Sequence, residues 1–221
     1  PVGEDIIANT RAVASALEAA GAIVEEVELP WTAERIFETA FTHFGNILAP
    51  AMRAATRGHE DTLADYTLQI MADAEAVASR HTFYEGLAAE AQIQAELATA
   101  MERFDVLLAP TSAVAGLEAD ASYLDGITID SNGVGREEVG AGNGAGGDGG
   151  GVRLEHYWQS HMTMPFNICN RVPIVNVPSG MADCGIPTGL QVIAHPFDDR
   201  TAFDVAAAVE QLVPWTGIAP G

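Results

Sequence analysis

The chain alternates stretches of helical periodicity with short apolar runs that end at or near proline. Five stretches repeat apolar residues at helical spacing, and four shorter runs are largely apolar. The helical stretches are residues 5–20, 32–44, 61–80, 84–104 and 201–212. The short runs are residues 23–29, 105–110, 172–177 and 190–194. This order predicts an α/β fold, in which a mixed sheet is covered by helices.

The first helix and the run after it are typical of the second half of an α/β unit. Gly21 stands where a C-terminal helix cap belongs, and residues 23–29 follow at once as a strand that Pro30 ends. The strand that should precede the helix is missing. The chain also begins at Pro1 rather than at methionine. We therefore expect a single unit, residues 1–221, that is a fragment of a larger domain.

The last helix begins after two adjacent acidic residues, Asp198 and Asp199. Asp199 or Thr201 can cap its N-terminus, and both charges interact favourably with the helix dipole. We favour this structural role over an acid–base pair. The side chains predicted to point inward from this helix are Phe203, Val205, Ala206 and Val209.

Residues 131–152 hold ten of the 22 glycines and almost no apolar side chain. Little is available to order such a stretch, so we predict a flexible surface loop. Gly142, Gly144 and Gly147 match the G-x-G-x-x-G pattern, but no strand precedes them and no helix follows. A dinucleotide-binding motif requires both, so the match is discarded.

The charge of the chain is strongly one-sided. It has 31 acidic residues against 10 basic ones, for a formal net charge of -21, and all the basic residues are arginine. The absence of lysine excludes a P-loop lysine, a Schiff base and a lysine general base within these residues. The negative charge repels phosphate backbones and anionic lipid, so we predict no nucleic-acid or membrane partner. It fits either an ordinary acidic protein or adaptation to high salt, and we favour the second.

The sequence offers few candidates for catalytic or metal-binding side chains. Cys169 and Cys184 are predicted to be small buried thiols, and His156 and His161 have the wrong spacing for two ligands on one helix face. We therefore predict no metal site and no cofactor. Ser179 lies in Pro-Ser-Gly rather than in G-x-S-x-G, and no residue is placed to act as an activated nucleophile. The lack of a signal sequence and of a long apolar run predicts a cytoplasmic protein.

Residues 177–199, VPSGMADCGIPTGLQVIAHPFDD, closely resemble the C-terminal hallmark of the amidase signature family. Residues 104–111 are similar to that family's Asp-Val-Leu-x-x-Pro-Thr strand. Residues 167–173 are similar to its Asn-Leu-x-Gly-x-Pro segment, although residues 170–172 depart from that pattern. Together with the first helix, these pieces resemble the C-terminal half of an amidase signature fold.

The resemblance implies hydrolysis of a carboxamide C–N bond by a serine nucleophile, with a second serine and a lysine that relay the proton. In the family these groups lie in the N-terminal half. This chain has no lysine and no glycine- and serine-rich stretch, so the resemblance implies no catalytic residue here. It implies instead a chain that is inactive alone and completes an amidase.

The family's C-terminal segments contact substrate, so the resemblance makes Thr163, Phe166, Asn167 and Asn170 the candidate substrate-binding residues. Core packing and backbone capping are the alternative roles for these four. The expected partners are a small-molecule amide and the N-terminal amidase half, in the same or a separate chain. A glycine-rich insert and the acidic charge favour a stand-alone amidase over an enzyme that acts on transfer RNA.

A non-catalytic binding or assembly subunit with the same half-fold is the alternative function. A half-sheet exposes an unpaired edge in either case, which is also compatible with a homo-oligomer.

Overall fold

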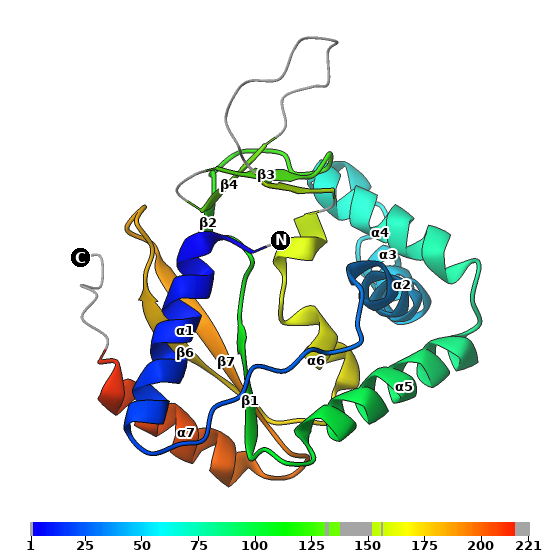
Figure 1. The fold of residues 1–221 in the computed structure, drawn as a ribbon. Helices are drawn as coiled ribbons and strands as arrows, with labels where there is room; N and C mark the ends of the chain where they lie inside the picture. The colour runs from blue at the N-terminus through cyan, green and yellow to red at the C-terminus, as the bar shows by residue number, and fades with distance from the viewer. Residues whose placement is uncertain (1, 131–132, 138–151, 156, 215–221) are drawn as a thin grey trace. The chain divides into compact units, whose positions relative to one another are not determined.

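The computed structural model describes residues 2–130, 133–137, 152–155 and 157–214 (Figure 1). The residues cluster into two compact units. The larger unit contains Pro1–Glu28, Ala100–Thr163 and Arg171–Gly221. The smaller unit contains Leu29–Thr99 and Met164–Asn170.

The larger unit is built on an antiparallel three-stranded sheet with the order β1-β7-β6. The strands are β1 (Val106–Pro110), β6 (Ile174–Met181) and β7 (Pro187–Ala194). Each overlaps one of the predicted apolar runs, at residues 105–110, 172–177 and 190–194, so these three strand predictions are confirmed apart from their exact ends. β7 is the central strand, and it is almost entirely buried.

Two helices cover one face of this sheet. They are α1 (Glu4–Ala19) and α7 (Asp199–Leu212), which lie along the sheet in Figure 1. Residues paired across antiparallel strands share a face, so Leu108, Val192 and Val175 point to the same side. We call this side the helix-covered face. Its buried core consists of Val13, Val177, Leu190, Val192, Ala206 and Val209.

A second, smaller sheet belongs to the same unit. Its order is β2-β4-β3-β5, with β2 (Gly116–Leu117), β3 (Ile127–Ile129), β4 (Val134–Glu137) and β5 (Val152–Leu154). Its buried core consists of Val114, Ile127, Ile129 and Leu154. A short 3₁₀ helix, η3 (Tyr157–Ser160), follows β5. Within the range 131–152 that the sequence predicts as a flexible loop, residues 134–137 form β4 and residue 152 begins β5, while residues 131–132 and 138–151 lie outside the described residues.

The smaller unit is helical. Its elements are α2 (Ala33–His43), the π-helix η1 (Phe44–Leu48), α3 (Ala49–Ala55), the 3₁₀ helix η2 (Glu60–Thr62), α4 (Asp65–Ala78), most of α5 (Phe83–Met101) and α6 (Met164–Cys169). The Thr32 side chain caps α2 by accepting a hydrogen bond from the backbone N–H of Arg35 at 3.2 Å, as predicted. Glycine at position 45 lets η1 approach α4, since a Cβ there would lie 2.0 Å from the Ala74 carbonyl oxygen.

An ion pair joins α2 to α5 within this unit. The Arg35 guanidinium donates to both carboxylate oxygens of Glu96, at 2.9 and 3.1 Å, and the Trp31 indole donates to Glu96 Oε2 at 3.0 Å. The bonds from Arg35 are the main reason that the pKa of Glu96 is lowered. The pair fixes the start of α2 in a bidentate geometry.

Three predictions about local structure are wrong. Residues 23–29 form no strand, since they have no regular secondary structure. Phe203 points outward from α7, with 64% of its surface exposed. The residue that caps α7 is Asp198, one position earlier than predicted, because its Oδ1 accepts from the Thr201 N–H at 3.2 Å.

We predict that the Asp198 cap makes the stability of α7 depend on pH. Hydrogen bonds from the Thr201 hydroxyl and N–H lower the pKa of Asp198. The contribution of the Asp198 carboxylate to the free energy of unfolding is therefore fully present above the ordinary pKa of an aspartate carboxyl. It is lost as the pH falls through the lowered pKa. Asp198→Ala should lower the melting temperature at pH 7, and the difference from the parent should shrink in acid. Asp198→Ser keeps a hydrogen-bond acceptor without a charge. A difference in melting temperature between the parent and the Ser variant that did not change with pH would contradict the prediction.

Candidate functional site

The candidate site lies on the face of the main sheet opposite α1 and α7. The Thr111 N–H donates to the Gly189 carbonyl at 3.0 Å, which extends the β1–β7 ladder by one residue beyond β1. Gln191 pairs with Asn176 in the next strand. Since paired residues share a face, Thr111, Gln191 and Asn176 all lie on this side, which we call the polar face. Polar residues on one face of a sheet whose other face is apolar are candidates for binding.

Gln191 is the buried centre of the polar face. Its side chain has no exposed surface, and its Nε2 donates to the carbonyl oxygens of Pro110 at 2.8 Å and Met162 at 3.2 Å. The amide therefore ties the end of β1 to the segment that precedes α6. Its Oε1 is buried and has no hydrogen-bond partner among the described residues. A buried polar group is costly unless it is bonded, so this side chain is held in one orientation by its two donated bonds.

Thr111 and Asn176 form the accessible part of the polar face. The Thr111 hydroxyl donates to Asn176 Oδ1 at 3.3 Å, and the Asn176 side chain lies at the surface. Glycine at position 189 leaves room for this contact, because a Cβ there would lie 2.8 Å from Thr111 Oγ1. A hydroxyl and a primary amide can donate to and accept from a neutral polar group such as a carboxamide. No charged side chain belongs to this group of residues.

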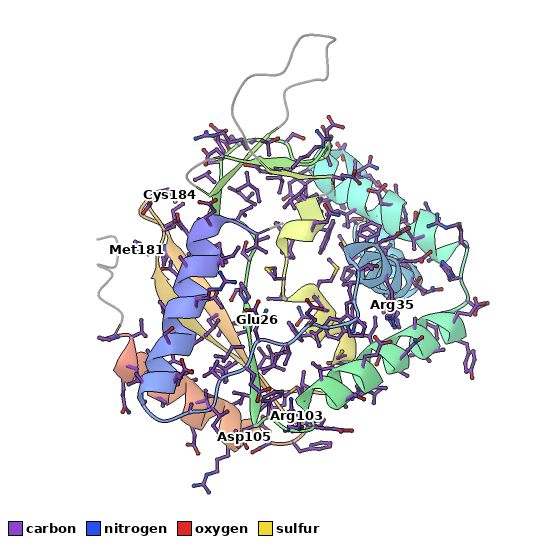
Figure 2. The ribbon with its side chains drawn as sticks, viewed as in Figure 1. Glu26, Arg35, Arg103, Asp105, Met181 and Cys184 are labelled. Carbon is purple, nitrogen blue, oxygen red and sulfur yellow. The ribbon has the colours of Figure 1, made fainter. Side chains whose placement is uncertain are left out.

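The hydroxyl groups near the turn between β6 and β7 have a structural role. Ser179 and Thr188 are buried and hydrogen-bond to each other at 2.8 Å, and Asn9 Nδ2 donates to Thr188 Oγ1 at 3.0 Å and to the Met181 carbonyl at 3.2 Å. Figure 2 labels Met181 at this turn, beside α1. Since Ser179 is bonded to another hydroxyl and not to a base, it lacks the activation that a nucleophilic serine needs.

An aromatic cluster lies close in sequence to the polar face. The rings of Tyr157 and Trp158 are 5.3 Å apart, and those of Trp158 and His161 are 5.2 Å apart. A backbone bridge between Ser112 and His161 joins the cluster to the residue after Thr111. Burial lowers the pKa of His161, so its imidazole is neutral at pH 7. The cluster thus offers uncharged aromatic surface.

The four predicted substrate-binding residues differ in their surroundings. Thr163 is half-buried in the larger unit, whereas the other three belong to the smaller unit. Phe166 is buried and packs edge-on against Trp31, with ring centroids 5.8 Å apart, so it has a packing role. Asn170 has a positive φ of 45° and its N–H donates to the Phe166 carbonyl at 3.3 Å, which ends α6. Asn167 is exposed, and a substrate-binding role stays a prediction for all four residues.

Other groups in the described residues add no evident site. No cluster of three or more His, Cys, Asp or Glu side chains could hold a metal ion there. Of the two free cysteines, Cys169 is buried and Cys184 is half-buried. None of the described helices combines the length and hydrophobicity needed to cross a bilayer.

Comparison with known proteins gives sequence relatives and structural neighbours, although no family model matches the chain. The chain is 25% identical to the A subunit of the glutamyl-tRNA(Gln) amidotransferase of Exiguobacterium sibiricum, over 95% of its own length and 42% of that protein. It is 29% identical to the corresponding protein of Granulibacter bethesdensis, over 57% of its length and 20% of that protein. Its fold is similar to a bacterial aryl acylamidase of the amidase signature family, with a TM-score of 0.71, 21% identity, and coverage of 98% of this chain and 42% of that one.

These findings confirm the resemblance to the amidase signature family and the mixed α/β fold. They also show that the chain spans less than half the length of the proteins that it resembles. Gln191, Thr111 and Asn176 are not among the site residues predicted from the sequence, although Gln191 is the one polar residue in the apolar run 190–194.

We predict that Gln191 acts by fixing the segment that contains Met162. Gln191→Met keeps the size of the side chain but removes both donated bonds, so it should lower the free energy of unfolding by about 2 kcal/mol. Gln191→Glu places a carboxylate against two carbonyl oxygens and should cost about 4 kcal/mol at pH 7. Urea unfolding measures both values. Equal stability of the Met and Glu variants would contradict the donor role.

Proposed function

We propose that residues 1–221 are the carboxyl-terminal portion of an amidase that hydrolyses the C–N bond of a small-molecule carboxamide. In this proposal the nucleophilic serine, the second serine and the lysine of a Ser-Ser-Lys mechanism are supplied by an N-terminal half outside these residues. The chain contributes scaffold and one wall of the substrate site, and it is inactive alone.

The observation that supports this proposal most is the partial coverage of the relatives. Nearly all of the chain aligns with 42% of the Exiguobacterium amidotransferase protein, so more than half of that protein has no counterpart here. The sequence contains no lysine, so a lysine-dependent proton relay would have to come from that other part. Among the described serines of the larger unit, Ser112, Ser160 and Ser179 are bonded to backbone groups or to Thr188.

The polar face supports a neutral amide as the substrate. Thr111 and Asn176 present a hydroxyl and an amide, and the neutral aromatic cluster adds apolar surface. Pockets that combine apolar walls with a few polar groups are usual for small ligands. The two sequence relatives named above act in transfer-RNA amidation by their names, but a net charge of -21 opposes a polyanionic ligand on this portion.

The alternative is a non-catalytic assembly subunit that uses the same half-fold to bind a partner. The coding sequence upstream of residue 1 distinguishes the two. A lysine followed by a glycine- and serine-rich tract would support the amidase, whereas an unrelated upstream sequence would support the assembly role.

We predict that residues 1–221 expressed alone release no ammonia or amine from carboxamides. The same residues joined to, or expressed with, the complementary half should hydrolyse at least one member of a panel of aliphatic amides and aryl acylamides. Product release is measured by coupled ammonia assay or by chromatography. Hydrolysis by the isolated chain, which survives repurification, would refute the placement of the catalytic residues elsewhere.

We predict that Asn167 contacts substrate in the complete enzyme. Its side chain is exposed, so Asn167→Ala should leave the melting temperature unchanged while it raises KM about tenfold, the loss of roughly one hydrogen bond. Asn46→Ala, at another exposed asparagine of the same unit, is the control for KM; its melting temperature is compared separately, because Asn46 Nδ2 donates to the Thr42 carbonyl at 2.8 Å. If both variants have the parent KM, Asn167 is not a substrate-binding residue.

A further inference from the structure

The outer edge of β1 offers unpaired backbone groups. β1 pairs with β7, and the bond from the Thr111 N–H to Gly189 fixes which residues face β7. In an antiparallel ladder these residues alternate, so Leu107 and Ala109 face β7 while Val106 and Leu108 direct their N–H and C=O groups away from it. Among the described residues, no backbone or side-chain group bonds to those four outward groups. All five residues of β1 are only half-buried.

The two edges of the main sheet differ in their protection against pairing. β6, at the other edge, contains Pro178, a bulge between Pro178 and Gly180, and a positive φ at Gly180. Proline and bulges are the usual means by which a permanent edge strand avoids further pairing. Val106–Pro110 is apolar and regular, with proline only at its last position. β1 therefore has the features of an interior strand whose neighbour is absent.

A second segment with unpaired backbone follows α1. Residues 23–28, IVEEVE, have strand-forming residues, and Ile23 is 87% exposed. No described group hydrogen-bonds to their backbone. Two ion pairs between exposed side chains hold the segment, from Arg103 to Glu25 at 3.1 Å and from Arg11 to Glu26 at 3.9 Å. Such pairs contribute little to stability. Figure 2 labels Glu26 in this segment, and Arg103 and Asp105 just before β1.

The direction of α1 shows how a strand could lie between the unpaired edge of β1 and the unpaired backbone of residues 23–28. α1 starts beside the end of β1, because the Gly3 N–H donates to the Ala113 carbonyl at 2.8 Å. The segment after α1 lies beside the start of β1, because Glu25 pairs with Arg103. α1 therefore runs antiparallel to β1. A strand that leads into α1 would run parallel to β1, and a right-handed strand–helix–strand crossover would place it next to residues 23–28.

We infer that one β-strand from polypeptide outside residues 1–221 inserts between β1 and residues 23–28 and pairs with both, parallel to β1. The inference rests on the proposed function, since it names the first contact between the two amidase halves. Residues 23–28 become a strand only when that neighbour is present. The inserted strand is interior and lies under α1, so it is a short apolar, β-branched run. Acidic residues on it would be repelled by Glu25, Glu26 and Asp105.

Hydrogen–deuterium exchange tests the insertion. In residues 1–221 alone, the amides of residues 23–28, Val106 and Leu108 should exchange rapidly, while those of Leu107 and Ala109 are protected by β7. In the complete protein, with the complementary half joined or co-expressed, the first set should slow together by roughly 100-fold or more. Slow exchange of residues 23–28 in the dilute isolated chain, or no slowing in the complete protein, would overturn the inference. If the exchange of these amides slows as the concentration of the isolated chain rises, the edge of β1 pairs with a second copy of the chain. That result would also overturn the inference.

Two adjacent proline variants sharpen the test. Val24→Pro and Glu25→Pro remove N–H groups that point to opposite sides of a strand, so only one of the two should reverse the protection. Glu25→Gln controls for loss of the ion pair. Neither proline should alter the isolated chain. Equal effects of both prolines in the complete protein would contradict pairing on one side. Amide hydrolysis is assayed on the same samples, so protection without activity refutes the proposed function alone, and activity without protection refutes the insertion alone.

Discussion

The structure of the larger unit depends on the hydrogen bonding of β7, which has a strand on each side. Alternate residues of β7 point to opposite faces of the sheet. Leu190 and Val192 are buried on the helix-covered face, under α1 and α7, whereas Gln191 lies on the polar face and bonds to Pro110 and Met162. One strand therefore closes the hydrophobic core and also places the polar residues that could meet a ligand. A shift of register by one residue would exchange the two faces.

Sequence patterns predicted those elements whose stability is local or whose apolar period is clear. Helices α1, α2, α4, α5 and α7 and strands β1, β6 and β7 belong to this class, because periodicity, proline and glycine mark them. The short helices α3 and α6 were not predicted. The small sheet was missed because Gly116–Leu117 and Ile127–Ile129 are too short to show a period. Phe203 was misplaced because Ala202, Ala206 and Val209 already fill the inward stripe of α7. Residues 23–29 were predicted as a strand on composition, but a strand also needs a neighbour to bond with.

The candidate site was harder to predict than the fold. Phe166 and Asn170 were chosen from a motif, with packing and capping as their alternative roles. The contacts themselves, Phe166 with Trp31 and the Asn170 N–H with the Phe166 carbonyl, depend on the fold and cannot be read from the motif. Gln191 is informative for a different reason: a fully buried amide within an apolar strand is costly unless its bonds are specific. Thr111 and Asn176 come together only through strand register, which depends on pairing between segments 65 residues apart. No local pattern contains that information.

The charge of the chain bears on how it could associate with a second half. Exposed arginines form ion pairs with Glu25, Glu26, Glu75, Asp130 and Asp204. Ten arginines cannot neutralise 31 carboxylates, so most acidic groups remain uncompensated. Any polypeptide that approaches β1 must do so against this field, unless it is itself basic or salt screens the charges within a few ångströms. Backbone pairing is well suited to such conditions. The bonds of a β-ladder are short-ranged, they do not depend on the sign of the side-chain charge, and an apolar strand beneath α1 adds burial that salt strengthens rather than weakens.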